Sequence, residues 1–504
     1  MLTHVRALVT LVRAGVIRPM GPRGLSGAAR GYAHWDITLA WGYATGAARH
    51  PDRPAIIDDE GTLTYAQVDE RTTRLANALR AEPKQRVAIL CRNHRGVIET
   101  MTACVKIGAS TVLLNTGLSA AQVAKVLEEQ NVALVVADPE FRDIVGHDNI
   151  IWTDELDDLI DKAPATPLPR RPPRGRLIVL TSGTTGAPKG AQRPEPASLL
   201  PAAALLSRIP LRHGEVIAIP APLFHTWGLA AFQIGLVLGA TLVLRRKFDP
   251  EQTLQDVEDR NCTTMFVVPV MLQRMLEVGK RPKLRIIASS GSALPPPVAT
   301  RTLAEFGPVL YNLYGSTEVS WASIATPDEL ARRPGTAGRP PIGTRVAIVD
   351  ESGKPLPPGR TGRIFVGNEM LFEGYTNGGN KEVLHGLMST GDLGYRDDDD
   401  LLYVAGRDDE MIVSGGENVY PREVEDLLAA LPGVREVAVV GVSDDEFGQR
   451  LAAYVVCSSE ITADHIREHV KANLARFSVP RDVVFLDALP RNATGKVLKR
   501  QLHP

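Results

Sequence analysis

The stretch Leu177-Ile178-Val179-Leu180-Thr181-Ser182-Gly183-Thr184-Thr185-Gly186-Ala187-Pro188-Lys189-Gly190 joins an apolar run to a loop of glycines, hydroxyls and one lysine. A short apolar run bounded by glycine is typical of a buried strand, so the loop begins where a strand ends. Glycine lets successive backbone N–H groups point into one concavity, the hydroxyls add donors, and Lys189 adds a positive charge. The stretch therefore predicts a polyphosphate-binding loop.

The residues beside Lys189 distinguish this loop from a Walker loop. A Walker loop needs Gly-Lys followed by Ser or Thr, whereas here Lys189 follows Pro188 and precedes Gly190. This spacing disfavours a P-loop kinase. A lone stretch of this composition is also compatible with a flexible surface loop, so its interpretation depends on distant segments.

Four distant segments resemble, in order, further motifs of the adenylate-forming superfamily, which includes acyl-CoA synthetases, adenylation domains of peptide synthetases, and luciferases. They are Asn312-Leu313-Tyr314-Gly315-Ser316-Thr317-Glu318, Ser389-Thr390-Gly391-Asp392, Gly406-Arg407-Asp408-Asp409 and Pro490-Arg491-Asn492-Ala493-Thr494-Gly495-Lys496. With the phosphate loop they make five motifs in the family's order, and the resemblance extends from about Asp36 to the end. The chain most resembles the acyl-CoA synthetase branch.

The resemblance implies an α/β fold, with a large N-terminal domain of mostly parallel α/β sheets, a β-barrel-like subdomain and a small mobile α+β C-terminal domain. The residue pattern agrees, because strand candidates at 87–90, 110–114 and 132–136 alternate with helical patterns such as 120–130. The expected divisions are an N-terminal segment at 1–35, an AMP-binding domain at 36–408, and a domain carrying the catalytic lysine at 409–504.

Composition narrows the classes of protein. The 504 residues carry a formal charge of −1, which provides no field to attract nucleic acid, and no apolar run is long enough to span a bilayer. Four cysteines are scattered without close pairs, so we expect reduced thiols. A cytoplasmic location follows, and the excess of arginine over lysine suggests a bacterial source. The sequence does not indicate an oligomeric state.

The N-terminal segment contains no acidic residue before Asp36. Val5, Leu8, Val9, Val12 and Val16 share a helical face flanked by arginines. Three interpretations stay open: a helix packed on the main domain, peripheral membrane contact, or an organelle transit segment.

The resemblance also implies a nucleotide site. The residues expected to bind ATP or AMP are Thr181, Ser182, Gly183, Thr184, Thr185, Gly186, Lys189, Gly291, Ser292, Ala293, Asn312, Tyr314, Gly315, Ser316, Thr317, Asp392, Arg407 and Lys496. Among them Tyr314 would stack on the adenine, Asp392 would bind the ribose hydroxyls, and Lys496, Glu318 and Thr317 would be catalytic. Mg²⁺ would be held by Glu318 and by Thr184 or Thr185, because a hard cation prefers oxygen ligands.

The remaining expected sites concern the other substrates. His225 and Trp227 match the acyl-pocket motif, although a histidine among apolar residues is more often part of the core. No carboxylate stands at His225, which disfavours an α-amino acid substrate. Gly415 and Gly416 would allow close approach of CoA, and Asp409 falls on the family's hinge.

The function expected from these residues is ATP-dependent activation of an aliphatic carboxylic acid of medium or long chain. The acid would become acyl-AMP with release of pyrophosphate, and CoA would then take the acyl group and release AMP. ATP, Mg²⁺ and CoA are the implied cofactors. The alternatives are a ligase that loads a carrier-protein thiol and a CoA ligase for an aromatic or other acid.

Overall fold

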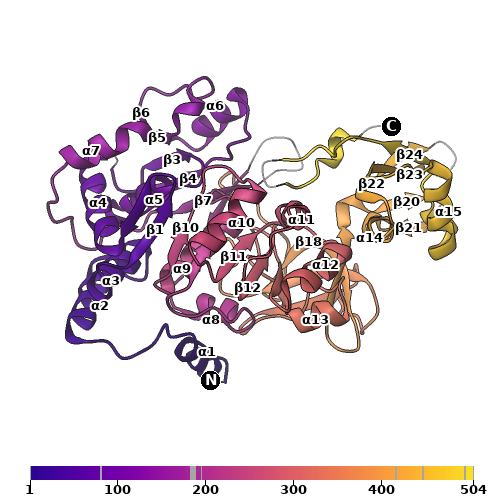
Figure 1. The fold of residues 1–504 in the computed structure, drawn as a ribbon, viewed down its shortest axis with the longest axis horizontal. Coiled ribbons are helices and arrows are strands. Elements are labelled where there is room, and N and C mark those ends of the chain that lie inside the picture. Colours follow the sequence, from indigo (N-terminus) through magenta and orange to yellow (C-terminus); the bar gives the residue numbers. More distant parts are fainter. Residues whose placement is uncertain are drawn as a thin grey trace.

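A computed structural model of the chain describes residues 2–79, 82–181, 189–194, 196–414, 417–444, 448–492 and 495–502. Three sheets with their helices form the larger part of the molecule, and a fourth sheet with two helices forms a separate lobe at the C-terminal end (Figure 1). This arrangement confirms the predicted fold class, and the third sheet is antiparallel as expected for the barrel-like subdomain, with an open strand order.

The largest sheet has eight strands. In spatial order they are β14 (Ser323–Ala325), β13 (Leu310–Tyr314), β12 (Ile286–Ser289), β11 (Thr264–Val267), β9 (Val216–Ala218), β10 (Thr241–Val243), β1 (Pro54–Asp58) and β2 (Gly61–Thr64). All inner pairs are parallel, and the two edge pairs are antiparallel. The carboxyl ends of the six parallel strands therefore lie along one edge, where binding sites of open α/β sheets form.

The second sheet has six strands, and two of them flank the predicted phosphate loop. Its order is β6 (Ile150–Trp152), β5 (Val132–Ala137), β3 (Arg86–Leu90), β4 (Ser110–Leu113), β7 (Leu177–Thr181) and β8 (Lys189–Arg193), parallel except for the pair β7–β8. The predicted buried strand is β7, as expected from its apolar run, and Thr181 pairs with Lys189 across the antiparallel ladder.

The two parallel sheets share a layer of helices. These helices are α3 (Leu39–Arg49), α4 (Tyr65–Ala78), α5 (Arg95–Ile107) and α9 (Thr226–Val237). α5 packs on β3 and β4, α9 packs on β10 and β11, and α3 contacts both helices. One continuous apolar core results, and side-chain caps at Thr64 and at Ser119 begin α4 and α6 (Ala120–Glu129).

Other helices complete the large part. They are α7 (Leu156–Lys162), α8 (Leu200–Leu206), α10 (Pro250–Asp259), α11 (Pro269–Glu277), α12 (Pro296–Phe306), α13 (Pro327–Arg332), and the short η1 (Pro139–Phe141) and η2 (Thr153–Glu155). The Pro- and Arg-rich residues 163–175 form neither helix nor strand, as the composition indicates. Cys91, Cys104 and Cys262 are buried and Cys457 is partly buried, all four as free thiols.

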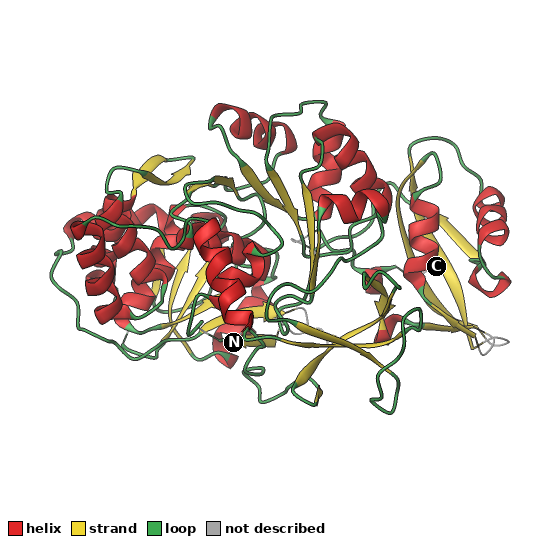
Figure 2. Ribbon diagram, turned by 90° about the horizontal axis from the view of Figure 1, so that it is seen from below, coloured by secondary structure: helices red, strands yellow, loops and turns green. Residues whose placement is uncertain are grey.

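The antiparallel third sheet comprises β15 (Arg345–Val349), β16 (Gly362–Gly367), β17 (Val383–Leu384), β18 (Leu387–Arg396) and β19 (Leu402–Arg407). The acidic run 397–400 forms the mostly exposed turn between β18 and β19. Figure 2 shows these long strands extending toward the C-terminal lobe.

The C-terminal lobe is a five-stranded sheet with two helices. Its elements are η3 (Asp408–Glu410), β20 (Ile412–Ser414), β21 (Glu417–Val419), α14 (Pro421–Ala429), β22 (Val434–Asp444), β23 (Gly448–Cys457), α15 (Ala463–Asn473), η4 (Arg476–Ser478), β24 (Asp482–Phe485) and η5 (Lys499–Gln501). Pro421 opens α14, a position that suits proline because the first helical N–H needs no partner, and Val424 and Leu428 bury the apolar face of the helix. The lobe has its own core.

Two helices precede the large domain, α1 (Leu2–Arg13) and α2 (Pro22–Trp35). α1 packs on α8 (Figure 1); its residues Ala7 and Leu11 are buried, as is Ala14 just after the helix. None of the helices that the structure describes has both the length and the apolar content needed to cross a bilayer.

Candidate active site

A cleft follows the carboxyl ends of the parallel strands and is closed on its other side by the C-terminal lobe. Its volume is about 2330 Å³. Segments after β7, β9, β11, β12 and β13 line one wall, and residues of β19, α14, β22 and the 491–502 segment line the other. Because most of the predicted motifs follow strand ends, the topology brings them into this one space.

The phosphate loop is only partly described. Thr181 lines the cleft, and its hydroxyl donates to the Lys189 carbonyl over 3.2 Å. The Lys189 ammonium lies 5.7 Å from the centre of the Tyr375 ring, a cation–π contact. Ser182, Gly183, Thr184, Thr185 and Gly186 lie outside the described residues, so their predicted roles stay predictions.

Tyr314 and Asp392 come from different sheets and meet in the cleft. The Tyr314 hydroxyl donates to Asp392 Oδ2 over 2.6 Å, and Arg407 Nε lies 3.8 Å from Asp392 Oδ1. Burial raises the pKa of Asp392, while the Tyr314 hydrogen bond and the Arg407 charge oppose that rise. Three residues predicted for the nucleotide therefore form one group.

Glu318 has two neighbours that the sequence analysis missed. The Tyr375 hydroxyl donates to Glu318 Oε1 over 2.7 Å, and Arg193 Nη1 donates to the Thr317 carbonyl over 2.7 Å. Burial lowers the pKa of Arg193 to about 10, and the nearby Glu318 charge opposes that shift. No local pattern marks Arg193 or Tyr375, since each lies outside the five motifs.

The segments after β12 and β13 supply the rest of the predicted nucleotide residues. Those that line the cleft are Gly291, Ser292, Ala293, Asn312, Gly315 and Ser316. A Cβ at Gly315 would lie 2.2 Å from the Ser320 carbonyl oxygen, so glycine is needed there. The Asn312 Oδ1 atom is buried and has no hydrogen-bond partner among the described residues, which leaves it available to a bound molecule.

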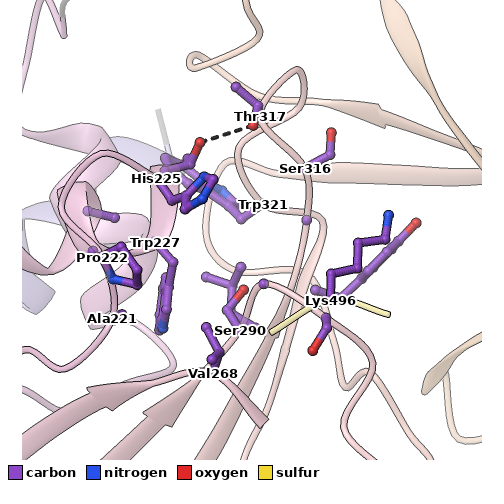
Figure 3. Close-up of a pocket in the computed structure, with 18 of the residues that line it drawn as sticks. Ala221, Pro222, His225, Trp227, Val268, Ser290, Ser316, Thr317, Trp321 and Lys496 are labelled. Carbon is purple, nitrogen blue, oxygen red and sulfur yellow. Dashed lines mark hydrogen bonds between the residues drawn. The ribbon is translucent and has the colours of Figure 1, made fainter. Parts of the chain in front are cut away.

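Lys496 reaches the cleft from the C-terminal lobe, on the side opposite Trp227 in the view of Figure 3. Its backbone N–H donates to Asn492 Oδ1 over 2.9 Å, and the Asn492 N–H donates back to the Lys496 carbonyl over 3.0 Å. Gly495 has φ +77°, and a Cβ there would lie 2.2 Å from Val270 Cγ1. The Asn492–Lys496 bonds and the close approach of Gly495 to Val270 thus hold the lysine against the large domain, and its charge acts on Asp392.

His225 and Trp227 border a recess at the start of α9, together with Ala221, Pro222, Val268, Ser290 and Trp321 (Figure 3). The Trp227 indole donates to the Val267 carbonyl over 3.0 Å, which fixes its ring as a wall. The Thr226 and Thr317 hydroxyls lie 3.1 Å apart at the mouth of the recess. Trp321 also escaped the sequence analysis, since it stands beyond the end of its motif.

His225 is partly buried in this recess, and its Nε2 atom is fully buried. Its Nε2 atom forms no hydrogen bond with any described residue, and burial lowers its pKa to about 4. The imidazole is therefore neutral near pH 7 and offers one unused polar atom. The alternative of an ordinary hydrogen-bonded core histidine does not apply at this atom.

The predicted CoA and hinge residues lie at the junction of the lobe. Gly415 and Gly416 are outside the described residues, between the paired ends Ser414 and Glu417 of β20 and β21. The backbone of Asp409 lies within η3, which joins β19 to the lobe.

Comparison with known proteins identifies the chain. Residues 43–376 match the family described as AMP-binding enzyme, and residues 423–496 match the AMP-binding enzyme C-terminal domain. The chain belongs to the AMP-binding enzyme family. The resemblance found in the five motifs is thereby confirmed.

Individual members of the family match over nearly their whole length. The chain is 34% identical to indoleacetate–CoA ligase of Aromatoleum aromaticum, over 90% of this chain and 95% of the relative. It is 32% identical to 2-succinylbenzoate–CoA ligase of Bacillus licheniformis, over 90% and 97%. The solved structure of o-succinylbenzoate CoA synthetase from Bacillus subtilis with its acyl-adenylate superposes with a TM-score of 0.82 at 29% identity, over 92% and 98%.

These relatives confirm the predicted enzyme class, an AMP-forming acid–thiol ligase that binds adenine nucleotides. They do not support the expected fatty acid or a role in lipid metabolism, because the relatives are named for aromatic acids. The aromatic alternative is the better supported one. The reason is physical: an apolar pocket motif without a charged anchor suits an alkyl chain and an aromatic ring equally well.

Proposed function

We propose that this AMP-binding enzyme is a CoA ligase for an aromatic carboxylic acid that bears a polar substituent. The observation that carries the proposal is the recess bordered by the Trp227 and Trp321 indoles, with the unpartnered His225 Nε2 inside it. Flat aromatic walls favour a flat ring by offset or edge-to-face packing. A buried polar atom without a partner favours a substrate that supplies one.

Adenylation is the proposed first step. The substrate carboxylate attacks the α-phosphorus of ATP, pyrophosphate leaves, and negative charge grows on the transferring oxygens. Lys496, which reaches the same cleft, would stabilise that charge. Asp392, beside Tyr314 and Arg407, would accept the ribose hydroxyls, and the unpartnered Asn312 Oδ1 would accept from another part of the nucleotide.

Glu318 is the one of the two predicted Mg²⁺ ligands that the structure describes, and its chemistry suits the ion. The Glu318 carboxylate lines the cleft and offers hard oxygen atoms, one of which accepts from Tyr375. Thr184, the second predicted ligand, lies outside the described residues. When bound, the ion would neutralise charge on the ATP phosphates.

Thiolysis is the proposed second step, in which the CoA thiol attacks the acyl carbonyl and AMP leaves. We propose that the unit 36–408 holds the adenylate while 409–504 turns about Asp409, bringing Gly415 and Gly416 to the pantetheine arm. A carrier-protein thiol is the rival acceptor. Release of AMP on addition of free CoA distinguishes the two.

Peripheral contact of α1 with an anionic bilayer is a further part of the proposal. Leu2, Val5, Leu8, Val9 and Val12 are 42–80% exposed on the face of α1 that does not touch α8. Arginines flank this face, and no acidic residue precedes Asp36. An apolar stripe with basic edges complements an anionic lipid surface.

The substrate proposal is tested by pyrophosphate release across two series of acids, with and without CoA. One series holds benzoate, phenylacetate, indoleacetate and hydroxylated ring acids, and the other holds hexanoate, decanoate and palmitate. We expect the natural protein to turn over the ring acids. In His225→Leu, kcat/KM for the hydroxylated ring acids should fall by about 10- to 100-fold. His225→Gln, which keeps a polar atom, is the matched control. Preference for the alkyl acids would refute the proposal.

A further inference from the structure

A second group of basic side chains, made of arginines and histidines, lies away from the active site. Arg18 Nη2 lies 2.6 Å from His50 Nε2, Arg53 Nη1 lies 3.0 Å from His213 Nε2, and the two imidazole rings are 5.5 Å apart. Arg49, at the end of α3, stands beside them and adds a third guanidinium. We call Arg18, Arg49, His50, Arg53 and His213 the basic cluster.

No carboxylate compensates the basic cluster. None of the ion pairs among the described residues involves Arg18, Arg49 or Arg53, and the charges that act on His50 are all arginines. Asp52 adjoins Arg53 in the sequence but is exposed. Three guanidinium groups that share a partly buried space repel one another, which is costly unless an anion joins them.

Once the hydrogen bonds within the basic cluster are made, the groups that remain for a ligand are donors. A guanidinium has no acceptor atom, and it can approach an imidazole nitrogen closely only if that nitrogen accepts. His50 and His213 must therefore accept through Nε2, and burial together with the arginine charges lowers the pKa of each to about 4, which keeps both rings neutral. Arg49 has no hydrogen-bond partner for its guanidinium among the described residues. A ligand for this group must consist of acceptors.

The fold places the basic cluster at the amino edge of the eight-stranded sheet. Arg53 directly precedes β1 and His213 lies just before β9, whereas the active site lies beyond the carboxyl ends. Arg53 also donates to the carbonyl of Gly239, which precedes β10, over 3.2 Å. The two sites are thus on opposite edges of one sheet.

The cleft connects these edges along α9. The partly exposed positions of this helix are Thr226, Ala230, Gln233 and Val237, a single stripe at helical spacing, and all four line the cleft. The stripe begins beside His225 and ends next to Gly239, a helix of 12 residues or about 18 Å. Arg18, Arg49, His50 and His213 line the far end of the same cleft. The basic cluster is therefore open to a ligand.

We infer that the basic cluster is a binding site for a phosphate group, separate from the nucleotide site. A phosphate has only acceptor oxygens, carries more than one negative charge as a monoester, and pairs with guanidinium groups through two parallel hydrogen bonds. The phosphate can belong to a free solute or to a lipid headgroup. The second source is at hand because Arg18 follows α1, whose outer face is apolar and exposed.

The free-solute arm titrates inorganic phosphate into the full-length protein by calorimetry, with saturating ATP and no acid substrate present so that the nucleotide site and its phosphate loop are both occupied. We expect one phosphate per chain for the natural protein. Arg18→Gln combined with Arg49→Gln should weaken phosphate at least 10-fold and leave ATP affinity unchanged. Arg53 is kept, because its bond to the Gly239 carbonyl supports the fold.

The lipid arm measures co-sedimentation with vesicles of phosphatidylglycerol, with phosphatidylcholine vesicles for comparison. Loss of phosphatidylglycerol binding in the double variant with no effect on inorganic phosphate assigns the site to a headgroup, and the reverse result assigns it to a free phosphate. Loss of binding to both inorganic phosphate and phosphatidylglycerol supports a site that recognises a phosphate group from either source. A double variant equal to the natural protein in both arms overturns the inference.

Two controls keep the experiment decisive. Arg212→Gln removes the same charge from an exposed side chain next to His213 that does not line the cleft, and it should change neither arm. If the double variant fails to fold, Arg49→Gln alone serves, since its guanidinium bonds to no described residue. Because it relieves repulsion, Arg49→Gln should keep or raise the Tm.

Discussion

The Tyr314 hydroxyl donates a hydrogen bond of 2.6 Å to the Asp392 carboxylate, across 78 residues of sequence and between two sheets. This bond stabilises the ionised form of a carboxyl group whose pKa burial raises. The phenol ring and the carboxylate are thereby held together on the wall of the cleft, so a change in the phenol should alter the ionisation of the carboxylate.

Tyr314→Phe should shift the pH dependence of ATP binding. Loss of the hydroxyl removes a bond that favours the carboxylate, so the pKa of Asp392 rises further and the group becomes neutral at a higher pH. A neutral carboxyl accepts the ribose hydroxyls poorly. In the variant, the pH below which the KM for ATP begins to rise should be higher by about one pH unit, since a bond to a charged group contributes roughly 1.5–3 kcal/mol. This rise of KM at low pH is the acid limb of its pH profile. Tyr395→Phe, on the same strand but without a hydrogen bond to Asp392, is the control, and an unmoved limb would contradict the prediction.

Lys496→Ala should separate the two half-reactions. A lysine aimed at the α-phosphate acts where charge develops, and its loss should lower acid-dependent pyrophosphate release by about 10²–10³-fold. Thiolysis of supplied acyl-adenylate should persist. Lys471→Ala, an exposed lysine on α15 of the same lobe, should affect neither step. Equal loss in both steps with the fold intact would show that Lys496 does not serve adenylation.

Asp409→Pro should impair thiolysis and spare adenylation, the reverse of the effect expected for Lys496→Ala. Lys496 lies in the cleft while Gly415 and Gly416 belong to the same lobe, so both can serve one adenylate only if the lobe reorients at the junction. Proline fixes φ near −65° and removes a donor, which restricts that rotation. We expect pyrophosphate release to continue and acyl-CoA formation to collapse. Natural rates in both assays would mean that this residue is not the hinge.

Leu8→Gln combined with Val12→Gln should reduce association with anionic vesicles. Both side chains are 52% exposed, so the change in folding free energy should stay within about 0.5 kcal/mol. Deleting residues 1–31 is a less selective test, because it also uncovers the surface of α8 on which α1 packs. Val383→Gln, at 53% exposure on β17, is the matched control. Equal sedimentation of the double variant and the natural protein would refute membrane contact by α1.

Local patterns predicted much of the fold. The strands at 87–90, 110–114 and 132–136 appear as β3, β4 and β5 within a residue of their expected ends, because strand propensity and turn residues act over a few positions. The start of α14 at Pro421 has the same origin. The helix α2 was not predicted, since small residues such as Gly24, Gly27 and Gly31 form its buried face and produce no apolar period.

The amino-acid sequence alone determined the family, the order of the motifs and the strand ends at which they stand, because each depends on neighbouring residues. It did not determine the shape of the acyl recess, where Trp227, Trp321 and the buried His225 Nε2 atom come from different parts of the chain. Only the tertiary structure placed Arg193 and Tyr375 beside the Glu318 motif and collected Arg18, Arg49 and Arg53 at one edge of a sheet. Such contacts join residues far apart in the chain, and they arise from strand order and packing, which no local spacing encodes.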